Sequence, residues 1–127
     1  MTRVLVVEDT PALRTLLTEA LSDAGFEVNS AEHGAEALEI AEQWRPDVIL
    51  LDLMMPVMDG PTFLKSRQQL PWLQRVPVMV LTAQPFQERL LDGLGATVTL
   101  RKPYDLDRLM DAIHALAEGE TGRGQVG

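Results

Sequence analysis

Acidic side chains follow two of the most apolar segments of the chain. Glu8 and Asp9 come directly after Arg3–Val7, and Asp52 comes directly after Val48–Leu51. Apolar runs without alternation are typical of strands that are buried on both faces of a parallel sheet. Because burying an unpaired carboxylate is costly, each acid should lie where its strand ends and a loop begins. Asp52 alone would be no more than a turn residue, so its role depends on what else converges on it.

Two further strand-like runs also end in polar side chains. Val76–Leu81 is followed by Thr82, and Ala96–Arg101 is followed by Lys102. In a parallel sheet with connecting helices, the carboxyl ends of the strands lie along one edge, and such domains bind their ligands there. We therefore expect three carboxylates, a hydroxyl and an ammonium group to meet in one shallow pocket.

A magnesium site with a nucleophilic aspartate is the chemistry that this set of groups favours. Carboxylates that crowd together raise one another's pKa, and a divalent cation relieves their repulsion. Oxygen donors without cysteine suit a hard ion such as Mg²⁺, which keeps positions open for a phosphate oxygen. Asp52 could then attack phosphorus and form an aspartyl-phosphate, while Thr82 and Lys102 hold the other phosphoryl oxygens. The alternative is an acidic cluster that pairs with Lys102 for structural reasons alone.

The segments between the strands have the spacing of amphipathic helices. Thr10 and Pro11 are a favourable N-cap and first helical residue, and Asp105 is a favourable cap for the last helix. The sequence predicts helices at about 11–24, 34–44, 61–69, 86–93 and 106–117, a short outer strand at 27–30 and a connection at 70–75. Five strands that alternate with five helices predict an α/β domain, with a parallel sheet and helices on both faces.

Length and composition limit the class of protein. The 127 residues fit one domain at 1–118, followed by a flexible tail or the start of a linker at 119–127. The absence of cysteine excludes disulfides and thiolate metal sites and fits a cytoplasmic location. A net charge of −8 argues against direct nucleic-acid binding by this domain, because phosphate contacts need clustered Lys and Arg. No apolar run is long enough to span a membrane, and the N-terminus has no signal-peptide pattern.

A series of separated motifs resembles the receiver domain of two-component response regulators. The motifs are, in chain order, Val4–Asp9, Asp52 before Met55-Pro56, Asp59-Gly60, Thr82-Ala83 and Lys102-Pro103. The resemblance covers about Arg3 to Ala117, which is nearly the whole chain. It implies a flavodoxin-like, doubly wound (βα)5 fold whose five-stranded parallel sheet has the strand order 2-1-3-4-5.

The resemblance also implies a role for each residue of the pocket. Asp52 would accept a phosphoryl group from a sensor histidine kinase or a phosphotransfer protein. Asp9, Asp52 and the backbone carbonyl of Met54 would bind Mg²⁺ or Mn²⁺, and Glu8 would act through a bound water.

The same resemblance covers the groups that would respond to phosphorylation, with one departure. Thr82, Ala83 and Lys102 would bind the phosphoryl group and form the switch, and the peptide bond before Pro103 is expected to be cis. Receivers usually carry Tyr or Phe three residues before the lysine, and this chain has Thr99 there. The usual account of switching by an aromatic side chain therefore does not transfer directly.

The leading interpretation is a signalling module that catalyses only its own phosphoryl transfer and dephosphorylation. Its downstream partner would be an unidentified protein, an output domain or a second copy of the chain. A receiver-like interaction module without phosphate control is the first alternative, which Thr99 favours slightly. A phosphohydrolase is less well supported, because Met54 stands where such enzymes often carry a second Asp. A nucleotide-binding protein is weaker still, since the chain has no Gly-rich phosphate motif and no Walker lysine.

Overall fold

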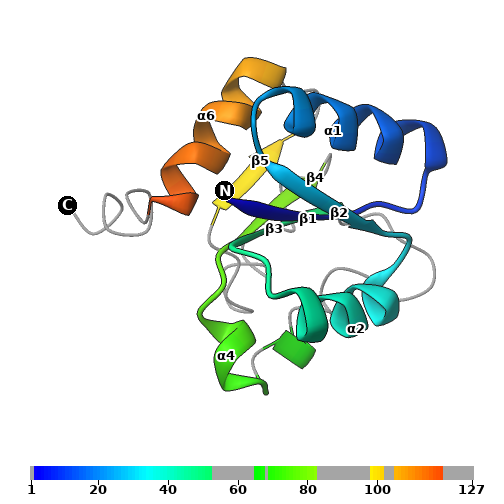
Figure 1. Ribbon diagram of the computed structural model, residues 1–127, viewed down its shortest axis with the longest axis vertical. Coiled ribbons are helices and arrows are strands. Elements are labelled where there is room, and N and C mark those ends of the chain that lie inside the picture. The colour runs from blue at the N-terminus through cyan, green and yellow to red at the C-terminus, as the bar shows by residue number, and fades with distance from the viewer. Residues whose placement is uncertain (1, 53–64, 68, 83–97, 102–104, 119–127) are drawn as a thin grey trace.

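A sheet of five parallel strands forms the centre of the structure. The computed structural model describes residues 2–52, 65–67, 69–82, 98–101 and 105–118. The strands of this described part are β1 (Arg3–Val7), β2 (Glu27–Ala31), β3 (Val48–Asp52), β4 (Val78–Thr82) and β5 (Val98–Arg101). Their order is β2-β1-β3-β4-β5, and each strand is parallel to its neighbour (Figure 1). The predicted sheet and its strand order are confirmed.

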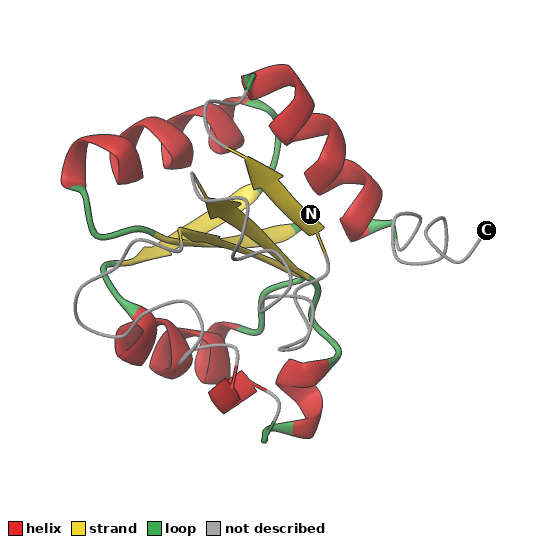
Figure 2. Ribbon diagram, turned by 180° about the vertical axis from the view of Figure 1, so that it is seen from behind, coloured by secondary structure: helices red, strands yellow, loops and turns green. Residues whose placement is uncertain are grey.

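Helices cover both faces of the sheet. α1 (Pro11–Asp23) and α6 (Leu106–Ala117) lie on one face, and α2 (Gly34–Trp44) and α4 (Pro71–Gln74) lie on the other (Figures 1 and 2). This three-layer arrangement is the doubly wound fold that the alternation of strands and helices predicts. Within the described ranges, no helix is both long enough and apolar enough to cross a membrane.

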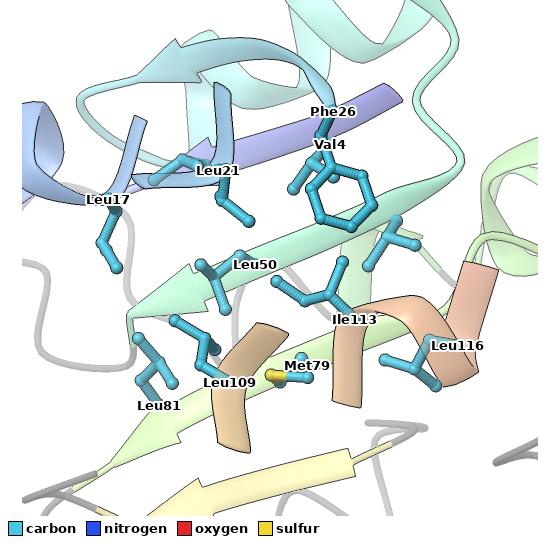
Figure 3. Packing of buried hydrophobic residues seen from close by; sticks show 12 residues of the cluster. Val4, Leu17, Leu21, Phe26, Leu50, Met79, Leu81, Leu109, Ile113 and Leu116 are labelled. Atoms are coloured by element: carbon cyan, nitrogen blue, oxygen red, sulfur yellow. The ribbon is translucent and has the colours of Figure 1, made fainter. Parts of the chain in front are cut away.

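The apolar residues of the strands alternate between two separate cores. Leu5, Ile49 and Val80 belong to the core beneath α2 and α4. The core beneath α1 and α6 contains more buried side chains and is shown in Figure 3. It contains Val4, Val6, Leu17, Leu21, Phe26, Val48, Leu50, Met79, Leu81, Leu109, Ile113 and Leu116. Because β1, β3 and β4 are buried on both faces, their carboxyl ends are held firmly in place.

α1 begins where the sequence predicts, but the expected side-chain cap is absent. Thr10 is the N-cap residue and Pro11 is the first helical residue, yet the Thr10 side chain makes no capping hydrogen bond. Instead, the Thr10 N–H donates to Glu8 Oε2 at 3.1 Å. The helix ends at Asp23, and Gly25 then has a φ of 99°, a conformation that glycine adopts without strain.

Reciprocal hydrogen bonds close the start of α2. The N-cap residue His33 accepts the N–H of Glu36 on Nδ1 at 3.2 Å. Glu36 in turn accepts the N–H of Glu32 on Oε1 at 2.8 Å. Two backbone N–H groups are satisfied in this way, as in a capping box. The loop that joins β2 to α2 is therefore fixed close to the carboxyl edge of the sheet.

Some predicted boundaries were wrong. The segment 70–75 was expected to be a connection, but it contains α4, whose Leu73 is fully buried. β4 begins at Val78 and not at Val76, although the carbonyl of Pro77 still accepts the N–H of Ile49 at 3.0 Å. Proline has no N–H to give to the sheet, which explains the late start.

Two predicted helices are described only in part or not at all. Of the helix expected at 61–69, residues 65–67 are helical and Gln69 is already in a turn, while 61–64 and 68 lie outside the described residues. The helix expected at 86–93 and the tail at 119–127 also lie outside the described residues.

Leu50 offers a direct test of the core beneath α1 and α6. Its side chain is fully buried in β3, so Leu50→Ala should remove packing on that face. We expect a loss of about 3 kcal/mol in the free energy of unfolding, measured by urea denaturation. Leu16→Ala is the matched control, because Leu16 on α1 is 50% exposed and should cost well under about 1 kcal/mol. Equal losses for the two variants would contradict this description of the core.

Candidate functional site

Three carboxylates meet at the carboxyl edge of the sheet. Val7, the last residue of β1, pairs with Leu51 of β3, so the residues that follow them, Glu8 and Asp52, are brought side by side. Asp9 comes next after Glu8. One carboxylate oxygen from each of the three acids lies within 4.8 Å of the others. The predicted convergence of Glu8, Asp9 and Asp52 is confirmed.

Glu8 is held by three hydrogen bonds, and one of its carboxylate oxygens has no hydrogen-bond partner among the described residues. Its N–H donates to the carbonyl of Ala31 at 3.0 Å, and its own carbonyl accepts a hydrogen bond from Arg14 Nη1 at 2.9 Å. Its Oε2 accepts the N–H of Thr10. Among the described residues, none hydrogen-bonds the buried Glu8 Oε1. An acceptor that is buried in this way is costly unless a water or an ion meets it.

The crowding has a strong electrostatic effect on Glu8. Burial, the close approach of the Asp52 carboxylate and its negative charge together raise the pKa of Glu8 to about 8. The hydrogen bond from the Thr10 N–H lowers the pKa of Glu8, but by less than the other effects raise it. In the protein without a bound cation, the Glu8 carboxyl therefore holds its proton to a higher pH than an exposed glutamate does. A divalent cation would supply the charge that lets all three acids ionise together.

The donor set fits a hard divalent cation. All three side chains offer carboxylate oxygens, and the two that flank Asp9 are almost completely buried, with Glu8 0% and Asp52 4% exposed. The unpartnered Glu8 Oε1 supplies an acceptor for a coordinated water. Oxygen donors of this kind suit Mg²⁺, which is commonly held by one or two carboxylates and several waters.

The backbone of β4 and β5 brings other predicted residues to the same edge. Asp52 pairs with Leu81, and the next residue along β4, Thr82, pairs with Arg101 at the end of β5. Lys102 follows Arg101 directly in the sequence. The side chain of Thr82 is not described, and Lys102 lies outside the described residues together with Met54, Ala83 and Pro103.

The remaining position of interest, Thr99, lies within β5 opposite Val80. Its backbone is described but its side chain is not. Arg14 also reaches the site, from α1, although no motif of the sequence includes it. No local pattern marks that residue, because its contact with the Glu8 carbonyl depends on how α1 packs against β1.

Comparison with known proteins identifies the family. The model for the response regulator receiver domain matches residues 4–114. Sporulation initiation phosphotransferase F of Bacillus subtilis is 33% identical over 113 residues, covering 87% of this chain and 90% of that protein. Other curated relatives are longer, and the chain spans about half of their length.

Solved structures agree in fold. The chemotaxis response regulator CheY4 of Vibrio cholerae has a TM-score of 0.85 and 36% identity, with 91% of this chain and 98% of that chain covered. The response regulator TrrA of Thermotoga maritima, solved in complex with Mg²⁺-BeF, has a TM-score of 0.80 and 31% identity, with 91% and 99% covered.

The chain therefore belongs to the response regulator receiver domains of two-component signalling. Such domains are phosphoacceptors in signalling, bind Mg²⁺ at an acidic pocket, and pair with histidine kinases or phosphotransfer proteins. Glu8, Asp9 and Asp52 form an acidic pocket of this kind.

The pH dependence of stability tests the electrostatics of the pocket. The pKa of Glu8 in the folded protein, about 8, lies above its ordinary value of 4.5. The stabilisation that this group contributes is therefore fully present below about pH 4.5 and is lost as the pH rises through about 8. Without metal, the wild-type protein should lose about 2 kcal/mol relative to Glu8→Gln between pH 6 and 8 in urea unfolding.

Addition of Mg²⁺ should offset this loss in the wild-type protein and should have a smaller effect on Glu8→Gln, because the cation favours the ionised form. Parallel stability curves for the two proteins from pH 6 to 8 would show that folding does not raise the pKa of Glu8.

Proposed function

We propose that Asp52 is the phosphoacceptor of this receiver domain and that Mg²⁺ is required for its phosphorylation. The observation that carries the proposal is the meeting of Asp52 with Glu8 and Asp9, whose carboxylate oxygens lie within 4.8 Å of one another. Asp52 ends a strand that is buried on both faces, so its carboxylate is presented from a rigid position.

The cation would be held by Asp9, Asp52 and the backbone carbonyl of Met54, with Glu8 acting through a bound water. The Oε1 of Glu8 supports the last of these roles, because it is a buried acceptor without a hydrogen bond from the described residues, on a side chain that lies beside the other two acids. Mn²⁺ should replace Mg²⁺, since both ions accept carboxylate, carbonyl and water ligands. When bound, the cation neutralises charge on the transferring phosphoryl group.

Phosphoryl transfer would proceed by in-line attack. An Oδ of Asp52 forms a bond to phosphorus while the bond from phosphorus to the leaving group breaks. With acetyl phosphate as donor, the leaving group is acetate, which departs with the bonding electron pair. Catalysis consists of positioning and charge neutralisation, and the domain acts only on its own phosphoryl group, without an external substrate to turn over.

Residues from the ends of β4 and β5 would bind the product. Thr82, Ala83 and Lys102 are proposed to contact the phosphoryl oxygens, with a cis peptide bond before Pro103. The register that places Thr82 beside Arg101 and one residue beyond the partner of Asp52 supports this arrangement. Thr99 would have to transmit the change without an aromatic ring, so the switch in this chain would depend on Thr82 and the segment that follows it.

The physiological donor is proposed to be a sensor histidine kinase or a phosphotransfer protein in the cytoplasm. The receiver would occupy 1–118, with 119–127 as a tail or the start of a linker. Its output would pass to a protein partner, an attached domain or a second copy of the chain. The net charge of −8 supports an output other than direct nucleic-acid binding by the receiver itself.

Intact-mass measurement after incubation with acetyl phosphate and Mg²⁺ tests the proposal. We expect one added phosphoryl group on the wild-type protein and none on Asp52→Asn, since the amide is not a nucleophile of comparable strength. Chelation of the metal should also prevent the addition. Asp47→Asn is the matched control, because Asp47 is an exposed aspartate at the opposite end of β3, and it should be modified like the wild type.

An unmodified wild-type protein would favour an interaction module without phosphate control. Modification of Asp52→Asn to the wild-type extent would place the phosphoacceptor elsewhere. Rapid turnover of unrelated phosphate esters would favour a phosphohydrolase.

A further inference from the structure

Arg14 links α1 to the backbone of the acidic site. Its side chain is 19% exposed, and its Nη1 donates to the carbonyl oxygen of Glu8 at 2.9 Å. Its Nη2 lies 3.7 Å from Glu32 Oε1, in the loop that joins β2 to α2. Arg14 therefore spans the two loops that border the carboxylates, although its own side chain is not among the proposed ligands.

The carbonyl that Arg14 binds belongs to the peptide unit between Glu8 and Asp9. That unit is planar, so one hydrogen bond to its oxygen restricts the orientation of the backbone on both sides. The Glu8 N–H is already fixed by Ala31, and Glu8 Oε2 is fixed by the N–H of Thr10. Arg14 supplies the remaining restraint, which acts on the link between the two acids.

The ion pair with Glu32 is the weaker of the two Arg14 contacts. The Glu32 side chain is 64% exposed and the charged atoms are 3.7 Å apart, so solvent screens their attraction. The hydrogen bond to the Glu8 carbonyl is shorter and partly buried, and its donor is charged. The contribution of Arg14 to the site should therefore depend mainly on the carbonyl contact.

Two effects of Arg14 on a bound cation oppose each other. Its positive charge repels a second cation, whereas its hydrogen bond holds Glu8 and Asp9 in place for coordination. The acids themselves, rather than Arg14, dominate the electrostatics at Glu8, where burial and Asp52 set the pKa. We infer that the second effect of Arg14 prevails.

We propose that Arg14 is a positioning residue for the divalent cation: it orients the Glu8–Asp9 peptide so that both acids face Asp52. This inference rests on the proposed cation site and adds a residue of α1 to it. Removing a residue that holds a metal ligand in place lowers metal affinity by roughly tenfold to a hundredfold.

The test is a Mg²⁺ titration of the full chain, monitored through the NMR chemical shifts of the Glu8 and Thr10 amides. Arg14→Met should weaken Mg²⁺ binding by roughly tenfold, near the lower end of the range for supporting partners. Arg14→Lys should restore part of the affinity, because its ammonium group can still donate to the Glu8 carbonyl. Phosphorylation of Arg14→Met by acetyl phosphate should approach the wild-type rate at saturating Mg²⁺.

Arg3→Met is the matched control. Arg3 makes the same kinds of contact at the opposite end of β1, with Nη1 2.6 Å from the carbonyl oxygen of Trp44 and Nε 3.2 Å from Glu27 Oε2. Its loss should lower stability without changing Mg²⁺ affinity, which separates positioning from a general loss of stability.

Two results would overturn the proposal. One is a change in Mg²⁺ affinity for Arg14→Met no larger than that for Arg3→Met. The other is tighter binding by Arg14→Met, which would show that charge repulsion prevails. If Mg²⁺ does not shift these amide signals in the wild-type protein, the proposed cation site itself is refuted. Normal binding by both wild type and Arg14→Met would refute only the role of Arg14.

Discussion

The structure depends on holding three carboxylates together that repel one another. Glu8, Asp9 and Asp52 place an oxygen each within 4.8 Å of one another, and burial together with the neighbouring Asp52 raises the pKa of Glu8 to about 8. An arrangement of this kind persists only when the surrounding structure fixes it more strongly than the charges oppose it. The sheet provides that support, because β1 and β3 are buried on both faces and pair in register up to the residues that precede the acids.

Backbone contacts around Glu8 extend the support beyond the strands. The β2 end binds its N–H through Ala31, the start of α1 binds its carboxylate through Thr10, and Arg14 binds its carbonyl. Every group of Glu8 except Oε1 is engaged in this way within the described part of the chain. Glu8 thus keeps one buried acceptor for a water at a site where three carboxylates meet, which is the form of site that a hydrated divalent cation fits. Membership of the receiver family and the geometry of the pocket lead independently to this interpretation.

The sequence predicts the sheet and the acidic site well for a common physical reason. A strand that is buried on both faces has a continuous apolar sequence. β1 and β3, and the acids at their ends, can therefore be identified in the sequence without tertiary information. α4 was missed because a helix of four residues, Pro71–Gln74, is too short to show a periodic pattern. Arg14 was missed because its contact is tertiary. The Thr10 side chain makes no capping hydrogen bond, and the Thr10 N–H donates to Glu8 instead.

A crystal structure of the protein with Mg²⁺ and beryllofluoride, which mimics a phosphoryl group on a carboxylate, tests the central claim most directly. The account predicts beryllofluoride bonded to an Oδ of Asp52 and a cation coordinated by Asp9 and Asp52, with a water between the cation and Glu8 Oε1. Beryllofluoride on another carboxylate, or a cation that contacts neither Asp9 nor Asp52, would contradict it.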